Sequence, residues 1–289
     1  MKRFTQVLII VLSIGILGCK KTNPQNVESK ITFNGGFETN NFSQWNDVNR
    51  NLDYPENYQI EIVTTPVREG LYAVKTTVHD GDEFLTTGGE RCDLERREPY
   101  EKEGDDLWYA WSTQFPTDWQ SFAYTAPYDW FVIADWHSEY DNVGQLIQLE
   151  VNSSNQIWVR GLTGKISSYT DFTGNGEANF FDKKVTNDLG LGLWNDFIFH
   201  VKWTTEDEGI IEFWHKVEGQ SSFIKILDLK DIPTLQFKAV KSQYKSPYFL
   251  LAHYRDASFT HTTTLYHDGF RQGTTKESIQ GPNNLYVID

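Results

Sequence analysis

Alternation of apolar and polar residues with a period of two is the feature that most constrains the fold of this chain. Segments of this kind, rich in β-branched and aromatic residues, are separated by turn-forming clusters such as Thr173-Gly174-Asn175-Gly176. They are residues 60–65, 107–115, 130–136, 146–151, 156–160, 194–203, 209–217, 248–255 and 262–270. No stretch of a dozen residues has the 3.6-residue period of an amphipathic helix. Many closely spaced strands without intervening helices predict an all-β sandwich, jelly roll or barrel.

The first residues predict export. Lys2 and Arg3 precede an apolar run over residues 7–17, which Gly18 and Cys19 follow. This run of about 11 residues is shorter than the roughly 20 that cross a bilayer, so it is typical of a cleaved signal peptide. We expect a lipoprotein signal peptide over residues 1–18, a lipidated Cys19, a flexible tether over residues 19–30 and one folded domain over residues 31–289. The alternative is an ordinary secretory signal with a chance cysteine.

The lipid would anchor the exported chain to the bacterial cell envelope, with the outer membrane as the expected location. If Cys19 is lipidated, Cys92 has no partner, and the core must hold the fold without an intrachain disulfide. The roughly 260 residues after the tether suffice for one large β domain. We also expect a monomer.

Composition restricts the partners. The chain carries 10 Trp and 14 Tyr, and sugar rings stack well on flat aromatic faces, which favours a carbohydrate. Its net charge of −14 opposes binding to nucleic acid, so we expect no nucleic-acid partner. A polyanionic substrate would require cations concentrated in the site.

Residues 89–98 carry the most informative charge pattern. In an extended strand, alternate side chains point to opposite faces. One face would then carry Arg91, Asp93, Glu95 and Arg97, and the other would carry Cys92 and Leu94. The pattern fits either a solvated outer face with weak ion pairs or a charged floor where arginine binds a carboxylate or sulfate.

A series of further segments carries motifs in a fixed order along the chain. They are Arg91 to Leu94, Trp108 to Ser112 with Phe115-Pro116, Trp130 to His137, Leu193 to Phe197 with Gly209 to Trp214, Pro247 to Arg255, and Thr264 to Phe270. Together, from Phe33 to Gly273, they resemble the jelly-roll polysaccharide lyases, a group that includes heparin lyase I, glucuronan lyases, alginate lyases and some ulvan lyases. The resemblance implies a β-jelly-roll sandwich of two antiparallel sheets with a concave substrate groove.

The resemblance also implies a reaction, β-elimination at a uronic acid of an anionic polysaccharide, which leaves a 4,5-unsaturated end. Removal of the C5 proton requires that the neighbouring carboxylate be neutralised, and Arg91 is the candidate for this role. A base and an acid must then reach C5 and O4, and the resemblance assigns these roles to His137 and Tyr254. Which of the two takes the proton stays open.

Further residues are expected to bind substrate. They are Asp93, Arg96, Arg97, Lys165, Tyr248 and Arg255. Three positions depart from the family pattern, because Leu250 and Ala252 replace a lysine and a glycine, and Asp135 replaces a glutamine. Asp135 would repel a polyanion unless it is paired or protonated. These departures argue against heparin and alginate and favour glucuronan or ulvan as the substrate.

Elimination of this kind requires no cofactor. The fold can carry a structural calcium, for which Glu38 and Asp268 are the candidate ligands; the alternative is that both are solvated surface carboxylates.

Two other functions stay open. A retaining glycosidase on the same fold needs two carboxyl groups about 5 Å apart, which Asp93 and Glu95 would supply. A noncatalytic surface glycan-binding lipoprotein would use the same aromatic residues and tether.

Overall fold

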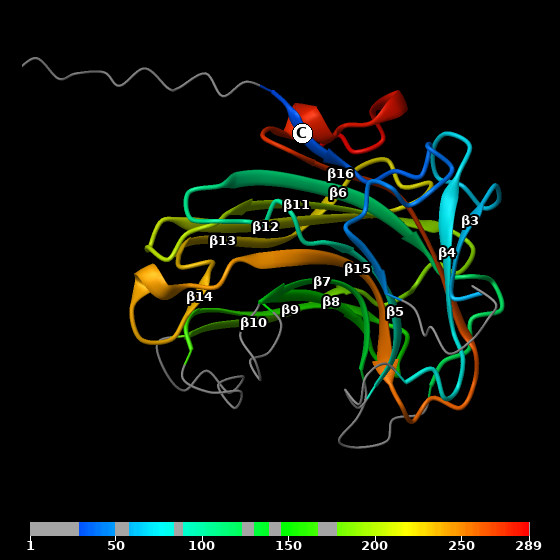
Figure 1. Ribbon diagram of the computed structural model, residues 1–289. Coiled ribbons are helices and arrows are strands. Elements are labelled where there is room, and N and C mark those ends of the chain that lie inside the picture. Colours follow the sequence, from blue (N-terminus) through cyan, green and yellow to red (C-terminus); the bar gives the residue numbers. More distant parts are fainter. Residues whose placement is uncertain are drawn as a thin grey trace, which may run out of the picture.

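The computed structural model of the chain describes residues 29–49, 58–83, 89–122, 130–138, 146–166 and 178–288. These residues form two stacked sheets, here called sheet A and sheet B (Figure 1). Both sheets curve in the same direction, and sheet A lies on the convex side of sheet B. Sheet A has the order β13-β12-β11-β6-β16-β4-β3, with β1 also paired to β16, and sheet B has the order β10-β9-β8-β7-β15-β5-β2. All pairs are antiparallel except that of β14 with β9.

The strands of sheet A are β1 (Ile31–Asn34), β3 (Ile60–Val63), β4 (Ala73–Val78), β6 (Asp106–Gln114), β11 (Trp194–Lys202), β12 (Gly209–Val217), β13 (Ile224–Ile232) and β16 (Thr263–Gly273). Those of sheet B are β2 (Asp47–Asn49), β5 (Gly89–Arg96), β7 (Phe131–Ser138), β8 (Ile147–Val151), β9 (Ile157–Lys165), β10 (Ala178–Thr186), β14 (Gln236–Phe237) and β15 (Pro247–Asp256). The expected all-β jelly-roll sandwich is confirmed, and each segment expected to be a strand contains one.

The sequence-based assignment missed β1, β2, β4, β10, β13 and β14. Three of them have only two to four residues, too few for a readable alternation. β10 and β13 are the edge strands at the same end of the two sheets, and many of their residues are exposed. An edge strand that is only half covered tolerates charged residues, which obscure the apolar period.

Aromatic side chains from both sheets fill the interior. The ring of Trp111 on β6 stacks on Phe199 of β11 at 5.8 Å between centroids and meets Trp136 of β7 edge-on at 6.1 Å. Phe249 on β15 lies 5.3 Å from Trp111, and all four side chains are fully buried. Each contributes roughly 1.5–3 kcal/mol by burial, so part of the aromatic content serves the core rather than a sugar.

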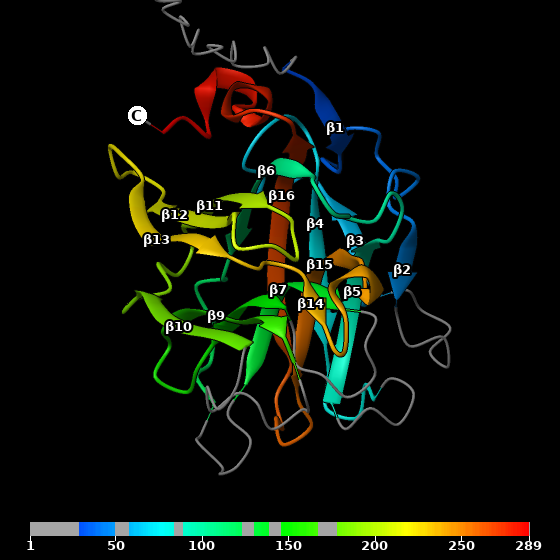
Figure 2. The ribbon, with the colours of Figure 1, turned by 90° about the vertical axis from the view of Figure 1, so that its left-hand side faces the viewer.

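The C-terminal segment covers the outer face of sheet A (Figures 1 and 2). It contains two short 3₁₀ turns, η3 (Lys276–Ile279) and η4 (Pro282–Asn284). Ile279 and Tyr286 are buried in a small cluster with Ala110 and Ile198, and the Tyr286 hydroxyl lies 2.9 Å from the Ser112 hydroxyl. The C-terminal segment therefore covers the part of this face around Ala110 and Ile198.

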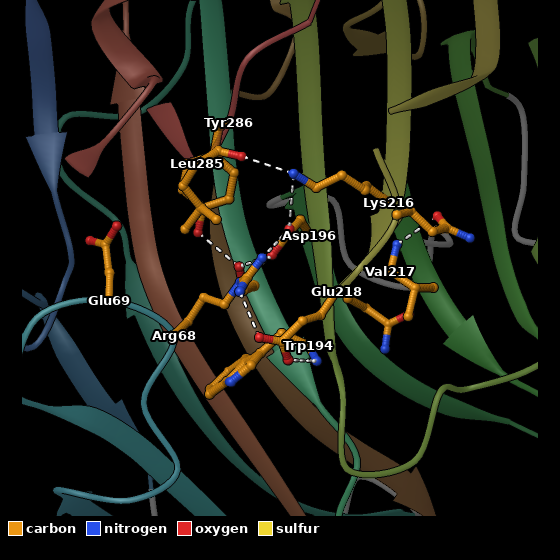
Figure 3. A network of polar contacts seen from close by, with 12 residues as sticks. Arg68, Glu69, Trp194, Asp196, Lys216, Val217, Glu218, Leu285 and Tyr286 are labelled. Carbon is orange, nitrogen blue, oxygen red and sulfur yellow. Dashed lines mark hydrogen bonds and ion pairs between the residues drawn. The ribbon is translucent and has the colours of Figure 1, made fainter. Parts of the chain in front are cut away.

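A polar network beside this segment joins distant parts of the chain (Figure 3). Both Nε and Nη2 of Arg68 donate to the Asp196 carboxylate, at 2.9 and 2.8 Å, and Nη1 donates to Glu218 at 2.9 Å. Lys216 lies 3.5 Å from Asp196 and donates to the Leu285 carbonyl at 3.1 Å. The network links the loop before β4 with β11, β12 and the C-terminal segment.

The expected signal peptide, Cys19 and most of the tether lie outside the described residues. Within the described ranges, no helix has the length and apolar character needed to cross a membrane.

Candidate functional site

The face of sheet B that points away from sheet A, here called the polar face, carries the charged residues expected of a site. On β5, Cys92 and Leu94 are part of the core between the sheets. Alternation therefore directs Arg91, Asp93 and Glu95 to the polar face, and Arg97 follows just after the strand. The predicted division of this segment into an apolar and a charged face is confirmed.

Strand β15 lies between β5 and β7 and forms the centre of the polar face. Its side chains there are Tyr248, Leu250, Ala252 and Tyr254, with a tyrosine at each end and aliphatic residues between. In register, Ala252 lies opposite Asp93, and Leu250 lies between Glu95 on one side and Asp135 on the other. The short middle side chains leave three carboxyl groups next to one another across the strand.

The first group of residues, the Tyr254 cluster, comprises Tyr254, Arg91, Trp130 and Gly89. Tyr254 is the register partner of Arg91, whose guanidinium carbon lies 5.1 Å from the centroid of the phenol ring. The Trp130 ring packs against the Tyr254 ring, with the ring centroids 4.5 Å apart and an angle of 57° between the ring planes. A Cβ at Gly89 would lie 2.5 Å from the Tyr254 ring and 2.7 Å from Trp130, so the close approach of both rings requires glycine.

The role of Trp130 and Gly89 in this cluster was missed by the sequence analysis. Trp130 was assigned to a strand and to a motif of the resemblance without a role of its own, and Gly89 only to the start of the charged segment. The contact depends on the pairing of β15 with strands that are more than 100 residues earlier in the chain, which no local pattern reports.

The second group, the Tyr248 cluster, comprises Tyr248, Arg97, His137 and Tyr100. The Arg97 guanidinium carbon lies 4.4 Å from the Tyr248 centroid, and the His137 ring lies 5.4 Å from it. Tyr100 meets Tyr248 edge-on at 6.4 Å. Burial raises the pKa of the Tyr248 hydroxyl, and the nearby Glu95 carboxylate raises it further.

The two clusters lie at opposite ends of β15. Tyr248 pairs with His137 and Tyr254 pairs with Val132, and six positions along an extended strand span about 20 Å. His137 and Tyr254 therefore share the polar face but do not face the same sugar ring. The expectation that they serve as acid and base at one glycosidic bond does not agree with this register.

Buried carboxyl groups occupy the middle of the polar face. Asp93 and Glu95 are each 1% exposed and Asp135 is 4% exposed. Arg91 Nε lies 3.4 Å from Asp93 Oδ2, and Arg97 forms an ion pair with Glu95. Burial raises the pKa of Asp93 to about 6, because desolvation and the nearby Glu95 outweigh the attraction of Arg91. Burial, with Asp93 and Glu95 nearby, raises the pKa of Asp135 well above its usual value.

Two arginines expected to bind substrate face the core instead. Arg96 is fully buried and forms an ion pair with Glu101, and Arg255 is fully buried with Nη2 2.7 Å from Glu90. The reason is alternation, because Arg96 has the parity of Leu94, and Arg255 has the parity of core residues Phe249 and Leu251. Both arginines neutralise buried glutamates and are not available to the polymer.

Lys165 lies at the far end of β9, beside Phe237 of β14. Strands β7 and β8 separate β9 from β15, so Lys165 is about 14 Å or more from the Tyr254 cluster. On the same strand, Arg160 is held between Glu150 at 2.9 Å and Asp182 at 3.3 Å. Lys165, which was expected to bind substrate, therefore does not belong to the Tyr254 cluster.

Glu38 and Asp268 do not fit a calcium site. The Glu38 carboxylate accepts backbone N–H bonds from Leu71 at 3.0 Å and Tyr72 at 3.1 Å. Asp268 accepts from the backbone of Arg68 at 2.7 Å and from two further N–H groups, those of Glu69 and Gly269. Donors occupy the oxygens that a cation would need, and the described residues contain no group of three or more candidate metal ligands. Both carboxylates fix the loop before β4.

Comparison with known proteins agrees with this architecture. The sequence model of a family described as polysaccharide lyase matches residues 37–271. No curated protein matches the chain in sequence. The solved endo-β-1,4-glucuronan lyase of the fungus Trichoderma reesei is 15% identical with a TM-score of 0.64, and the alignment covers 86% of this chain and 98% of that one.

Two more solved structures have a similar fold. The catalytic domain of a glycoside hydrolase family 131 protein from Coprinopsis cinerea is 12% identical with a TM-score of 0.51, covering 90% of this chain and 98% of that one. An exolytic alginate lyase from Zobellia galactanivorans is 11% identical with a TM-score of 0.51, and the alignment covers 77% of this chain and 90% of that one. At these identities the likeness shows the fold alone. Because the family match extends through both sheets, from Phe37 to Arg271, the chain belongs to the polysaccharide lyase family and is a polysaccharide lyase.

Proposed function

We propose that this lyase cleaves a polymer of D-glucuronate, either glucuronan or the glucuronate-linked parts of ulvan, at the Tyr254 cluster. The observation that carries the proposal is the pairing of Arg91 with Tyr254 on the polar face, where a guanidinium and a phenol lie within reach of one sugar. The glucuronan lyase of Trichoderma reesei, which has the same fold, supports this choice of polymer.

In the proposed reaction, Arg91 binds the uronate carboxylate and stabilises the negative charge that develops when C5 loses its proton. The ionised Tyr254 oxygen takes that proton, the C5–H electrons form the C4–C5 double bond, and the bond from C4 to the glycosidic oxygen breaks. Tyr254 then returns the proton to the leaving oxygen. One residue thus acts as base and then as acid.

This scheme favours a particular uronate. In D-glucuronate, H5 and O4 lie on the same side of the ring, so one phenol reaches both. In L-iduronate and L-guluronate, which have the opposite configuration at C5, the base and the acid must approach from opposite sides. His137 lies about 20 Å along the sheet from Tyr254, so the proposed scheme does not use His137 at this bond.

The Tyr248 cluster would bind a neighbouring part of the same polymer. Arg97 offers a cation, and Tyr248 and His137 offer flat rings beside it. We assign His137 to this binding role.

The test is ultraviolet absorbance of the unsaturated uronate after incubation with glucuronan, ulvan, alginate and heparin. We expect new absorbance with glucuronan or ulvan, and cleavage next to D-glucuronate. Tyr254→Phe should lose about 10³-fold in kcat with binding retained, because general acid–base catalysis contributes about 10²–10⁴-fold. Reducing ends without absorbance would indicate a hydrolase instead, and a near-normal rate for Tyr254→Phe would remove this residue from the mechanism.

We also propose that Cys19 carries lipid and anchors a monomeric enzyme to the cell envelope, most simply at the outer membrane. Cys19→Ala should move the protein from the membrane fraction to the soluble fraction of the expressing bacterium. Retention in the membrane fraction would exclude a lipid anchor at this residue.

A further inference from the structure

The charges in the middle of the polar face do not balance one to one. Arg91 is paired with Asp93, and Arg97 is paired with Glu95. Asp135 is 4% exposed, its Oδ1 has no hydrogen-bond partner in the described part of the chain, and no described cation forms an ion pair with it. An ionised carboxylate buried in this way is strongly disfavoured, and such a group binds a proton instead.

The surroundings of Asp135 determine which form it takes. The titratable and charged groups that face it on the polar face are Arg91, Asp93, Glu95 and Arg97 from β5 and its end, Tyr248 and Tyr254 from β15, His137 from β7, Glu150 from β8 and Arg160 from β9. Glu95 lies across Leu250 from Asp135 in register. Besides burial, the Asp93 carboxylate raises the pKa of Asp135 more than Glu95 does, and the Arg91 guanidinium lowers it. Arg160 forms ion pairs with Glu150 and Asp182. Its positive charge therefore does not offset the negative charges next to Asp135.

We propose that Asp135 is a neutral carboxyl group in the resting enzyme and donates a hydrogen bond to the carboxylate of the bound uronate, beside Arg91. This inference rests on the proposed function, and it names a second residue that neutralises the substrate. A protonated carboxyl is both a donor and uncharged, so a face that contains several acidic residues can still accept a polyanion. The raised pKa of Asp135, caused by burial and by Asp93 and Glu95, agrees with this state.

The ionisation state is tested on the free protein, independently of any substrate. In protein labelled with ¹³C at the aspartate carboxyl carbon, the Asp135 resonance is identified by its loss in Asp135→Asn. If that variant does not fold, Asp135→Glu gives the same assignment because it also removes the labelled carbon. We expect the chemical shift of a neutral carboxyl at pH 7. The shift of a carboxylate at this pH would overturn the proposal.

The role in binding is tested in Tyr254→Phe, which retains substrate without cleaving it. The dissociation constant for glucuronan oligosaccharides should rise about tenfold for each pH unit above the ionisation of Asp135. Tyr254→Phe/Asp135→Asn should lack this rise, because an amide stays neutral. Asp182→Asn in the same background is the matched control, since Asp182 lies on the same face but is paired with Arg160, and it should keep the rise. An equal rise with Asn at position 135 would overturn the donor role.

Failure of the proposed function would be seen separately. It would appear as the absence of new absorbance when the wild-type enzyme is given each of the four polymers, and it would also overturn the hydrogen bond to a uronate. If absorbance appears and only the pH dependence of Asp135→Asn fails, the lyase assignment stands and the role of Asp135 does not.

Discussion

At the scale of single residues, burial explains most of the unusual chemistry of the polar face. Asp93 lies among charged neighbours, yet it is 1% exposed, and desolvation has the largest effect on its pKa. Ionisation of this residue therefore destabilises the fold.

Asp93→Asn should make the stability of the protein less dependent on pH. The folded-state pKa of about 6 lies above the ordinary value of 3.8, so the stabilising protonated form is fully present below about pH 4 and is lost as the pH rises through 6. Between about pH 4 and pH 7, the free energy of unfolding of the wild type should fall by on the order of 2–3 kcal/mol relative to that of the variant. Urea unfolding at a series of pH values measures the difference, and parallel curves for the two proteins would contradict it.

Gly89→Ala should reduce turnover more than it reduces affinity. The added methyl group would lie 2.5 Å from the Tyr254 ring and 2.8 Å from the Arg255 backbone carbonyl, so the ring or the strand must move. A cost of about 1–3 kcal/mol in stability and at least about a tenfold lower kcat are expected. Gly36→Ala is the control, because only a side-chain atom of Asn34, at 3.3 Å, lies close to that position. Unchanged kcat in Gly89→Ala would mean that the placement of Tyr254 does not depend on this contact.

At the scale of elements, the two sheets have different tasks. The segment from Leu193 to Trp214, which resembles a lyase motif, forms β11 and β12 of sheet A and contributes Asp196 to the network with Arg68. This part of the resemblance belongs to the scaffold. The strands that form the candidate site, β5, β7 and β15, are neighbours in sheet B.

Arg68→Met should destabilise the protein without changing the chemistry. Among the described residues it leaves the fully buried Asp196 with Lys216, at 3.5 Å, as its remaining ion-pair partner, and breaking a buried pair costs about 3–5 kcal/mol. Lys75→Met, which removes an exposed pair with Glu61, should cost less than about 1 kcal/mol. Thermal unfolding compares the two, and kcat well below the unfolding temperature should equal that of the wild type. A similar small loss in both variants would show that the Arg68 network adds little.

At the scale of the whole molecule, the net charge of −14 opposes a polyanionic substrate, whereas Arg91 and Arg97 attract it over short distances. Salt screens the long-range repulsion first, because the Debye length falls from about 30 Å at 0.01 M to about 8 Å at 0.15 M. We therefore expect kcat/KM for the polymer to rise over this range of ionic strength. Initial rates at low substrate concentration test this, and a steady decrease would mean that the local cations dominate at all distances.

The sequence by itself determined where the main strands lie and which face of residues 89–98 is charged, because alternation is a local property of an extended chain. It also singled out Arg91, Asp93, Arg97, Tyr248, Tyr254 and His137 as candidate site residues, and the structure brings all six to the polar face. Edge strands and very short strands lacked a readable pattern.

Only the tertiary structure decided how these residues group. Pairing of β15 with β5 and β7 puts Tyr254 opposite Arg91 and His137 opposite Tyr248, which separates the two residues that the sequence had joined in one reaction. Burial in the sandwich turned Arg96 and Arg255 into partners of Glu101 and Glu90, and left Asp135 without a cation among the described residues. Register and burial arise from contacts between segments far apart in the chain, so the local pattern that predicts a strand cannot predict them.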